Sequence, residues 1–161
     1  MKKFFLSIDQ GTTSTRTVLY DFRFKYIDQE QIEIKQFYLK PGYVEHDAEE
    51  IWEKTYETFR KLLKKHDLQP AQIISIGITN QRETVLGWNS KTGKPIGKAI
   101  VWQDRRTAYI CNDLIEKNLD KKFEEKTGLI IDSYFSGTKI KWILDSIPSI
   151  RKKAENNSIK N

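Results

Sequence analysis

An apolar segment that ends on an acid, followed by a turn of small and hydroxylated residues, lies near the start of the chain. The segment 4–16 reads F-F-L-S-I-D-Q-G-T-T-S-T-R, with Asp9 after the apolar residues and Arg16 after the turn. Backbone N–H groups and hydroxyls in such a turn can surround phosphate oxygens, and an acid at a strand end can hold the accompanying Mg²⁺ through water. The spacing matches neither G-x-x-x-x-G-K-[ST] nor G-x-G-x-x-G. An ordinary hairpin that turns at Gln10-Gly11 is therefore the alternative.

Four residues farther along the chain offer complementary groups for a hydroxylated ligand. Arg82 and Glu83 directly follow a predicted strand, Trp102 ends an apolar segment, and Tyr134 lies in a loop before a predicted helix. A guanidinium can donate to neighbouring hydroxyl oxygens, a carboxylate can accept their protons, and aromatic faces can cover the carbon chain. Together the four would make a polyol site. Taken singly, a surface ion pair and two core aromatics are the alternatives.

The elements that must position these residues begin with three strands and a helix. Strand-forming residues joined by short turns predict strands over 4–9, 15–22 and 25–36. Asp47, with Glu50 three residues later, forms a capping box that predicts a helix start. The apolar stripe of this helix consists of Trp52, Tyr56, Phe59 and Leu63. A further strand is predicted over 73–79, with Ile74, Ile76 and Ile78 on one face.

The second half of the sequence predicts short strands and further helices. Strands are expected over 84–88 and 96–101, and helices over 104–118 and 137–146. Strands and helices in this order give a mixed α/β layer structure. The polar segment 151–161 is predicted to be a frayed tail, and a chain cut off before its next element is the alternative.

Composition describes a globular chain. With 161 residues, 38% hydrophobic and 31% charged, the sequence can bury a core of its own. No apolar run approaches the ~20 residues that cross a bilayer, and we expect no secretory signal in the first residues. The single cysteine, Cys111, precludes an internal disulfide and fits a reducing cytoplasm. Most of the net charge of +6 lies in 139–161, so we expect a solvated terminal segment and no nucleic-acid surface.

Several segments resemble the FGGY carbohydrate kinases and, among them, the glycerol kinases. S-I-D-Q-G-T-T-S-T-R (7–16) is typical of the broad family, whereas N-Q-R-E-T (80–84), V-W-Q-D-R-R (101–106) and D-S-Y-F-S (132–136) are similar to glycerol kinases. The other matching segments are P-G-Y-V-E-H-D-A-E-E-I-W (41–52), T-G-L-I-I-D-S-Y-F-S-G-T-K (127–139) and K-W-I-L-D (141–145). Ser133 stands where the resemblance predicts proline, a change that keeps the neighbouring tyrosine.

The resemblance implies an α/β fold of the actin/hexokinase type, a ribonuclease H-like ATPase domain. Such a domain starts with three antiparallel strands and continues as a mixed sheet with flanking helices. Kinases of this family have two ATPase-like domains, with the active site between them, in a chain much longer than this one. Residues 1–161 are therefore expected to form the N-terminal portion of the first domain. The proton-accepting aspartate would lie outside it, so the chain alone is expected to be inactive.

The resemblance also divides the predicted site residues between a nucleotide and an acceptor alcohol. Asp9 would hold Mg²⁺ through water. The phosphates of ATP would be contacted by Thr12, Thr13, Ser14 and Arg16. Glycerol would be held by Arg82, Glu83, Trp102 and Tyr134. Gln81 and His46 receive no role.

The implied reaction transfers the γ-phosphoryl group of ATP to glycerol, giving sn-glycerol 3-phosphate. The resemblance further implies a cytoplasmic enzyme that forms a homo-oligomer. Two alternatives stay open. One is a kinase for another polyol or a ketose on the same fold, and the other is a non-catalytic half-domain that binds a nucleotide or a partner.

Overall fold

The computed structural model describes residues 2–160, which form two compact units. The first unit contains the chain up to Gln36 together with Asp47–Gln81, and the second contains Phe37–His46 together with the residues from Arg82 onward. The residues predicted to contact phosphate fall in the first unit, and those predicted to hold the acceptor fall in the second. No helix among the described residues is long and apolar enough to cross a membrane.

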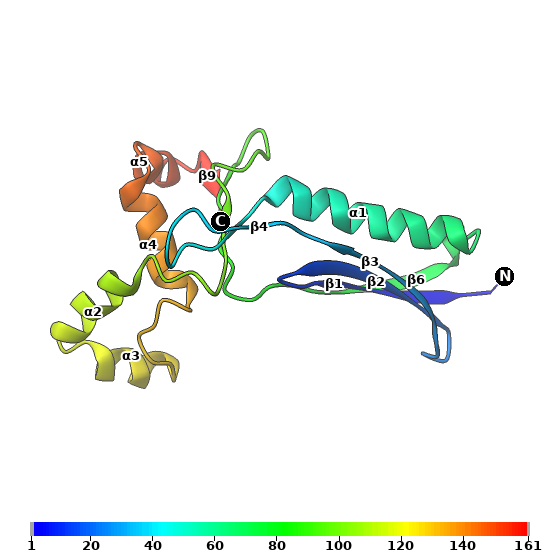
Figure 1. Ribbon diagram of the computed structural model, residues 1–161, viewed down its shortest axis with the longest axis horizontal. Helices are drawn as coiled ribbons and strands as arrows, with labels where there is room; N and C mark the ends of the chain where they lie inside the picture. Colours follow the sequence, from blue (N-terminus) through cyan, green and yellow to red (C-terminus); the bar gives the residue numbers. More distant parts are fainter. Residues whose placement is uncertain (1, 161) are drawn as a thin grey trace. The chain divides into compact units, whose positions relative to one another are not determined.

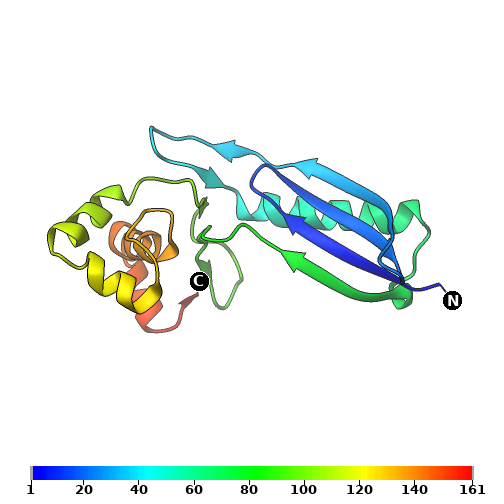
Figure 2. The ribbon, with the colours of Figure 1, turned by 90° about the horizontal axis from the view of Figure 1, so that it is seen from below.

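The first unit is built on a four-stranded sheet in the order β3-β2-β1-β6, seen from two directions in Figures 1 and 2. Its strands are β1 (Phe4–Gln10), β2 (Ser14–Asp21), β3 (Tyr26–Glu33) and β6 (Ile73–Thr79). The first three are antiparallel neighbours, as predicted, and β6 joins β1 in parallel. Because β3 and β6 run in the same direction, the chain must return between them, and α1 (Ala48–Lys65) makes this crossover before the short 3-10 helix η1 (Pro70–Gln72).

The helix α1 covers one face of the sheet (Figure 1). Its start is fixed by Asp47, whose carboxylate accepts hydrogen bonds from the N–H groups of Glu49 at 3.0 Å and Glu50 at 3.4 Å. Nearer the middle of the helix, the hydroxyls of Thr17 and Thr58 lie 2.8 Å apart, and both side chains are buried. The apolar core consists of Leu6, Leu19, Leu62 and Leu68, with Phe4, Phe59, Leu63 and Ile73 packed against it.

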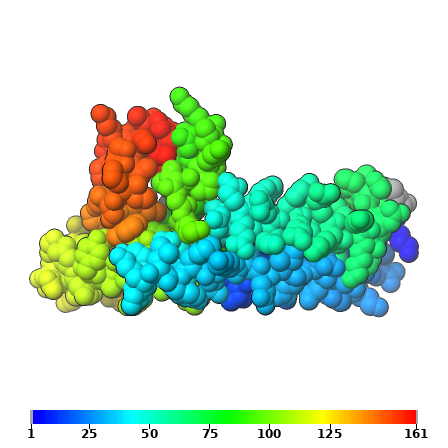
Figure 3. Space-filling model, turned by 45° about the horizontal axis from the view of Figure 1, so that its top comes forward, coloured from blue at the N-terminus to red at the C-terminus, as the bar shows by residue number. Residues whose placement is uncertain are grey.

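The predicted apolar stripe of α1 is buried over half of its length. Phe59 and Leu63 pack against the core, whereas the side chains of Trp52 and Tyr56 are 63% and 47% exposed. The fully buried residues Thr58 and Leu62 mark the line of the helix that faces the sheet, and Trp52 and Tyr56 lie to one side of that line. Figure 3 shows the helix, in the cyan-to-green part of the colour scale, at the visible surface.

Strand β6 presents a row of isoleucines on its exposed face. Ile74, Ile76 and Ile78 share this face, as predicted from their alternation. They are 51%, 42% and 71% exposed in the described part of the chain. The apolar core of the first unit is therefore on the α1 side of the sheet.

The second unit contains short strand pairs and four helices among the described residues. The helices are α2 (Ala108–Glu116), α3 (Asp120–Thr127), α4 (Ser136–Ser146) and α5 (Ile150–Glu155). The strand pairs are β5 (Glu45–His46) with β8 (Ala99–Ile100), and β7 (Trp88–Asn89) with β9 (Ile159–Lys160). The short strand β4 (Gln36–Phe37) spans the boundary between the units.

Several elements of the second unit are shorter than the sequence predicts. The strands expected over 84–88 and 96–101 reduce to two residues each, in β7 and β8, with an isolated bridge between Val85 and Ile100. The helix expected from residue 104 begins at Ala108 instead. The reason is that the Asp104 carboxylate accepts a bond from the Arg106 N–H at 2.8 Å, which shapes a turn before the helix.

A helix and a strand occupy most of the segment that the sequence predicts to be a frayed tail. Ile150, which starts α5, is 4% exposed, and β9 pairs with β7. The N–H of Ser90 also donates to the carbonyl of Ser158 at 3.0 Å. Distant partners thus order a segment whose own composition is polar, and composition alone could not reveal them.

Candidate functional site

The hydroxyl turn, residues 11–14, connects β1 to β2 and is held by its carbonyl groups. The Gly11 N–H donates to the Ser14 carbonyl at 3.0 Å, and a Cβ at Gly11 would lie 3.0 Å from that same oxygen. The Gly11 carbonyl accepts from Gln81 Nε2 at 2.9 Å, and the Thr13 carbonyl accepts from the Ile34 N–H at 3.0 Å. The turn is therefore a tight hairpin, as the alternative interpretation has it, and the carbonyls of Gly11, Thr13 and Ser14 accept hydrogen bonds within the protein.

The three hydroxyl side chains of the turn differ in exposure. Thr13 is exposed, and Thr12 and Ser14 are half-buried. Ser14 Oγ accepts a hydrogen bond from Gln31 Nε2 at 2.9 Å. Hydroxyls and backbone N–H groups collected in four residues are a suitable set of donors for an anion. A hairpin and a phosphate-contacting turn are thus compatible descriptions of this segment.

Asp9 and Arg16 face each other beside the hydroxyl turn. They are register partners in the β1–β2 ladder, and Arg16 Nη2 lies 2.8 Å from Asp9 Oδ2. Each side chain is 40% exposed. Arg16 Nε is buried and has no hydrogen-bond partner among residues 2–160. The hairpin therefore places one carboxylate and one guanidinium next to the turn, both open to solvent.

Asp9 suits a metal that keeps its water ligands. Residues 2–160 contain no group of three or more His, Cys, Asp or Glu side chains that could hold a metal ion. Mg²⁺ usually retains several waters and is bound through one or two carboxylates together with substrate phosphates. A half-exposed carboxylate beside the hydroxyl turn fits this mode of binding and does not fit a cage made by protein ligands alone.

The acceptor cluster, Arg82, Glu83, Trp102 and Tyr134, lies in the second unit, and the structure brings three of its members to one loop. Glu83 Oε2 accepts hydrogen bonds from the N–H of Ser136 at 2.7 Å and from its hydroxyl at 2.6 Å. The rings of Trp102 and Tyr134 meet edge to face, with centroids 5.8 Å apart. Since Tyr134 lies two residues before the start of α4, the carboxylate and both aromatic rings converge there.

Arg82 stands apart from this convergence. Its side chain is exposed and makes no hydrogen bond or ion pair within residues 2–160. Glu83 is bound to Ser136, so the surface ion pair considered from the sequence is not formed. Tyr134 is 38% exposed, so it is not a core aromatic, whereas Trp102 is half-buried. The polyol roles of the four residues stay predictions. Of the alternatives, the ion pair between Arg82 and Glu83 is not formed, and Tyr134 does not lie in the core.

Lys139 is a neighbour of the acceptor cluster that sequence reasoning missed. The sequence places it with the solvated terminal charge, yet it is 0% exposed. Its Nζ donates to the carbonyl of Glu83 at 3.0 Å and to the carbonyl of Tyr134. Burial lowers the pKa of Lys139 to about 8. Its place one turn into a predicted helix was the available signal, because a long side chain there can reach back to the preceding loop.

The second unit also contains a buried ion-pair network around Arg106. Its Nη2 lies 2.8 Å from Asp104 Oδ2 and 2.7 Å from Glu45 Oε1, and the rings of Tyr43 and Trp142 flank the guanidinium. Burial alone would lower the pKa of Arg106, but its bonds to Asp104 and Glu45 outweigh that cost and raise it. With the arginine 2% and the aspartate 0% exposed, this network serves the fold.

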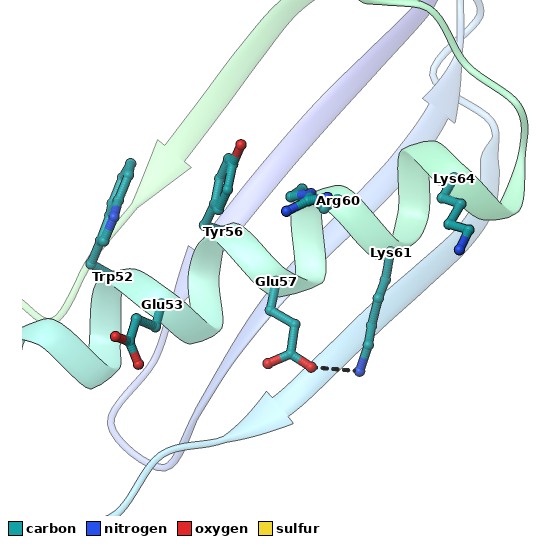
Figure 4. Close-up of a pocket in the computed structure, with 7 residues that line it drawn as sticks. All are labelled: Trp52, Glu53, Tyr56, Glu57, Arg60, Lys61 and Lys64. Carbon is teal, nitrogen blue, oxygen red and sulfur yellow. Dashed lines mark ion pairs between the residues drawn. The ribbon is translucent and has the colours of Figure 1, made fainter.

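A groove on the outer face of α1 contains none of the predicted site residues (Figure 4). Its cavity is about 390 Å³, and the stacked rings of Trp52 and Tyr56 line it, with centroids 5.8 Å apart. Charged side chains of the same helix complete the lining, including the ion pair of Glu57 with Lys61 at 2.8 Å. The groove is therefore a surface feature of one helix, separate from the hydroxyl turn and the acceptor cluster.

Comparison with known proteins identifies close relatives along nearly the whole chain. Residues 4–160 match the N-terminal domain of the FGGY family of carbohydrate kinases. The glycerol kinase of Caldanaerobacter subterraneus subsp. tengcongensis is 54% identical over 155 residues, which cover 96% of this chain and 31% of that protein. The glycerol kinase of Bacillus cereus strain AH187 is 52% identical over 159 residues, which cover 99% of this chain and 32% of that protein. The chain thus spans about a third of the length of these relatives.

Solved structures show the same relationship. The crystal structure of Plasmodium falciparum glycerol kinase with ADP superposes with a TM-score of 0.90 at 35% identity, covering 99% of this chain and 32% of that one. The ligand-bound xylulose kinase of Lactobacillus acidophilus superposes with a TM-score of 0.81 at 25% identity, covering 95% of this chain and 29% of that one. These matches bear out the α/β, actin-like ATPase fold expected from the sequence.

Proposed function

This chain belongs to the FGGY family of carbohydrate kinases, and from that premise we propose that it supplies the phosphate-contacting turn and the acceptor site of a glycerol kinase. The proposed reaction transfers the γ-phosphoryl group of ATP to glycerol and gives sn-glycerol 3-phosphate. Glycerol kinases that are 52–54% identical over nearly the whole chain support glycerol as the acceptor. A cytoplasmic location and self-assembly stay predictions.

The anchoring of Glu83 carries the proposal. One of its carboxylate oxygens takes both bonds from Ser136, at 2.7 and 2.6 Å, which fixes the direction of the whole group. The carboxylate can then accept a hydrogen bond from an alcohol hydroxyl, while Arg82 donates to hydroxyl oxygens and the rings of Trp102 and Tyr134 cover a short carbon chain. An analogue without a hydroxyl would leave a group unpaired at a cost of ~1–3 kcal/mol, which is the basis of specificity.

On the nucleotide side, the hydroxyl turn and Arg16 would contact the phosphates. The relative solved with ADP supports a nucleotide site in this fold. Phosphoryl transfer depends mainly on positioning and on neutralising phosphate charge, and bound Mg²⁺ supplies part of that neutralisation. Asp9 would orient the ion through its water shell, and Arg16 would add a fixed positive charge. No residue of this chain is assigned as the proton acceptor.

The experiment that tests the proposal compares acceptors in the complete kinase, meaning a protein that carries this chain with the further segments of its relatives. We expect phosphorylation of glycerol with a kcat/KM at least about 100-fold above that for xylulose or gluconate, since each lost or misplaced hydroxyl contact costs roughly 5- to 150-fold. A kcat/KM for xylulose or gluconate equal to or above that for glycerol would show a kinase for another polyol or ketose.

The isolated 161-residue chain is the matched control for this experiment. We expect it to form no glycerol 3-phosphate, because a positioned general base alone contributes ~10²–10⁴ in rate and this chain is assigned none. Steady ATP-dependent turnover by the isolated chain would contradict that assignment. A complete kinase that binds nucleotide but phosphorylates none of the three acceptors would favour a binding module.

A further inference from the structure

We propose that Lys139 is a positioning residue for the acceptor alcohol, because it ties the backbones of Glu83 and Tyr134 together from inside the second unit. The inference rests on the proposed function of the acceptor cluster. It concerns a residue that touches neither the alcohol nor the nucleotide and that acts through the two residues it holds.

Lys139 donates hydrogen bonds to two members of the acceptor cluster. Its Nζ donates to the carbonyl of Glu83 at 3.0 Å and also to the carbonyl of Tyr134. The same helix, α4, begins with Ser136, which binds the Glu83 carboxylate through its N–H and its hydroxyl. Residues of α4 thus bind both the carboxylate and the backbone carbonyl of Glu83. Lys139 of the same helix also binds the backbone of Tyr134.

Glu83 needs these contacts because of its backbone conformation. Its φ is +64°, in the left-handed region that is costly for a residue with a Cβ. Strained residues of this kind persist where several surrounding bonds determine the same geometry, and they gather at functional sites. The bonds from Ser136 and Lys139 are the determining contacts here. Without Lys139, Glu83 could relax toward an ordinary conformation, and its carboxylate would turn away from the alcohol.

The burial of Lys139 is itself unusual for a lysine. The side chain is 0% exposed, and lysines are almost never fully buried unless they are paired. Burial lowers its pKa to about 8, while the carboxylates of Glu83, Asp104 and Asp132 favour the charged form. The ammonium group is therefore charged at neutral pH. Carbonyl oxygens that face a charge accept stronger hydrogen bonds than they would from a neutral donor.

The test substitutes Lys139→Met in the complete kinase and measures kcat and KM for glycerol and for ATP. Methionine keeps the volume and removes the donor, so we expect the KM for glycerol to rise about 10- to 100-fold, while the KM for ATP stays within about twofold. Lys141→Met is the matched control: Lys141 lies on the same helix, is 56% exposed and pairs with Asp145. It should change neither KM.

Two further variants keep the inference testable if Lys139→Met does not fold. Lys139→Arg retains the charge and several donors, and Lys139→Gln retains an amide donor on a shorter side chain. We expect the KM for glycerol to increase from wild type to the arginine variant to the glutamine variant, with melting temperature measured on the same samples. An unchanged KM for glycerol in every folded variant would overturn the positioning role.

Arg82→Ala in the same assay separates this inference from the proposed function. If Arg82→Ala raises the KM for glycerol and the Lys139 variants do not, the acceptor cluster stands and the positioning role of Lys139 is wrong. If the wild-type kinase does not phosphorylate glycerol at all, the proposed function is wrong, and the positioning role falls with it.

Discussion

Each unit contains an arginine–aspartate ion pair, and the two pairs have the same nitrogen–oxygen distance but differ in burial. Arg16 and Asp9, in the first unit, lie 2.8 Å apart, and each side chain is 40% exposed. Arg106 and Asp104, in the second unit, also lie 2.8 Å apart, but their side chains are 2% and 0% exposed. The distance alone therefore does not distinguish a pair that holds the fold from a pair that can serve a ligand.

Burial makes that distinction, because it determines whether a charged side chain can exchange its partner for a ligand. An exposed pair contributes about 0–1 kcal/mol and can exchange its partner for a bound ion at little cost. A buried pair cannot be broken without leaving an uncompensated charge in the interior. We therefore assign Arg106 and Asp104 to the stability of the second unit and Arg16 and Asp9 to the proposed phosphate chemistry.

The largest expected effect is the loss of stability on removal of the buried arginine. Arg106→Ala would leave Asp104 and Glu45 without their partner, and breaking a buried pair in this way costs about 3–5 kcal/mol. Arg105→Ala is the neighbouring control, since Arg105 is 58% exposed where it pairs with Asp132. Thermal unfolding of both variants measures the difference. Equal melting temperatures of the two variants would contradict the assignment of Arg106 and Asp104 to the stability of the second unit.

The next effect concerns the exposed carboxylate. Asp9→Ala in the complete kinase should lower kcat about 10²–10³-fold, the usual loss when one fixed charge or donor at a transition state is removed. The KM for glycerol should stay close to wild type, because Asp9 would act at the metal and phosphates. Steady-state kinetics at saturating ATP measures both. A variant that loses stability and keeps kcat would show that Asp9 belongs to the hairpin alone.

A smaller effect is expected from the acceptor cluster. Glu83→Gln keeps one oxygen that can accept the bonds from Ser136 and replaces the other oxygen by a donor. The preference for glycerol over 1,2-propanediol should fall, by up to the roughly 5- to 150-fold that one hydroxyl partner is worth. The ratio of the two kcat/KM values is the measurement. An unchanged ratio would remove Glu83 from the acceptor site.

The smallest expected effect is a dependence of stability on pH that comes from Asp28, a half-buried carboxylate of the first unit. Hydrogen bonds from Lys65, then His66, then the Gln29 N–H hold the pKa of Asp28 well below its usual range. A carboxyl whose pKa is lower in the folded state adds stability above its ordinary pKa and loses it as the pH falls. Asp28→Asn should therefore lose less stability than wild type below about pH 4. Parallel acid unfolding curves would contradict this.

The parts of the fold that could be predicted from the sequence are those made by neighbours along the chain. The strands β1 to β3 and the cap of Asp47 depend on residues within a few positions of one another, and they lie where expected. The family motifs also predicted the residues of the acceptor cluster, and the structure brings Glu83, Trp102 and Tyr134 to one loop. Local patterns and motif resemblance were enough for these features.

The features that could not be predicted depend on partners far apart in the chain. The bond between Glu83 and Ser136 joins residues 53 positions apart, and Lys139 reaches back 56 positions to the same glutamate. The place of Lys139 in a predicted helix indicates that its side chain can reach the preceding loop, but it does not show that the ammonium group is buried there. Trp52 belongs to the predicted apolar stripe of its helix, yet its side chain is exposed. Spacing along a helix predicts an apolar stripe, but it does not reveal which residues of that stripe the distant strands will cover.

The most direct test of the comparison is one variant measured in two ways. Arg16→Ala in the complete kinase should melt close to the wild-type temperature, because the pair it breaks is exposed, and its kcat should fall about 100-fold, because a fixed charge beside the phosphates is lost. A variant that keeps the wild-type kcat, or whose kcat falls only together with its melting temperature, would contradict the assignment of the exposed pair to phosphate chemistry.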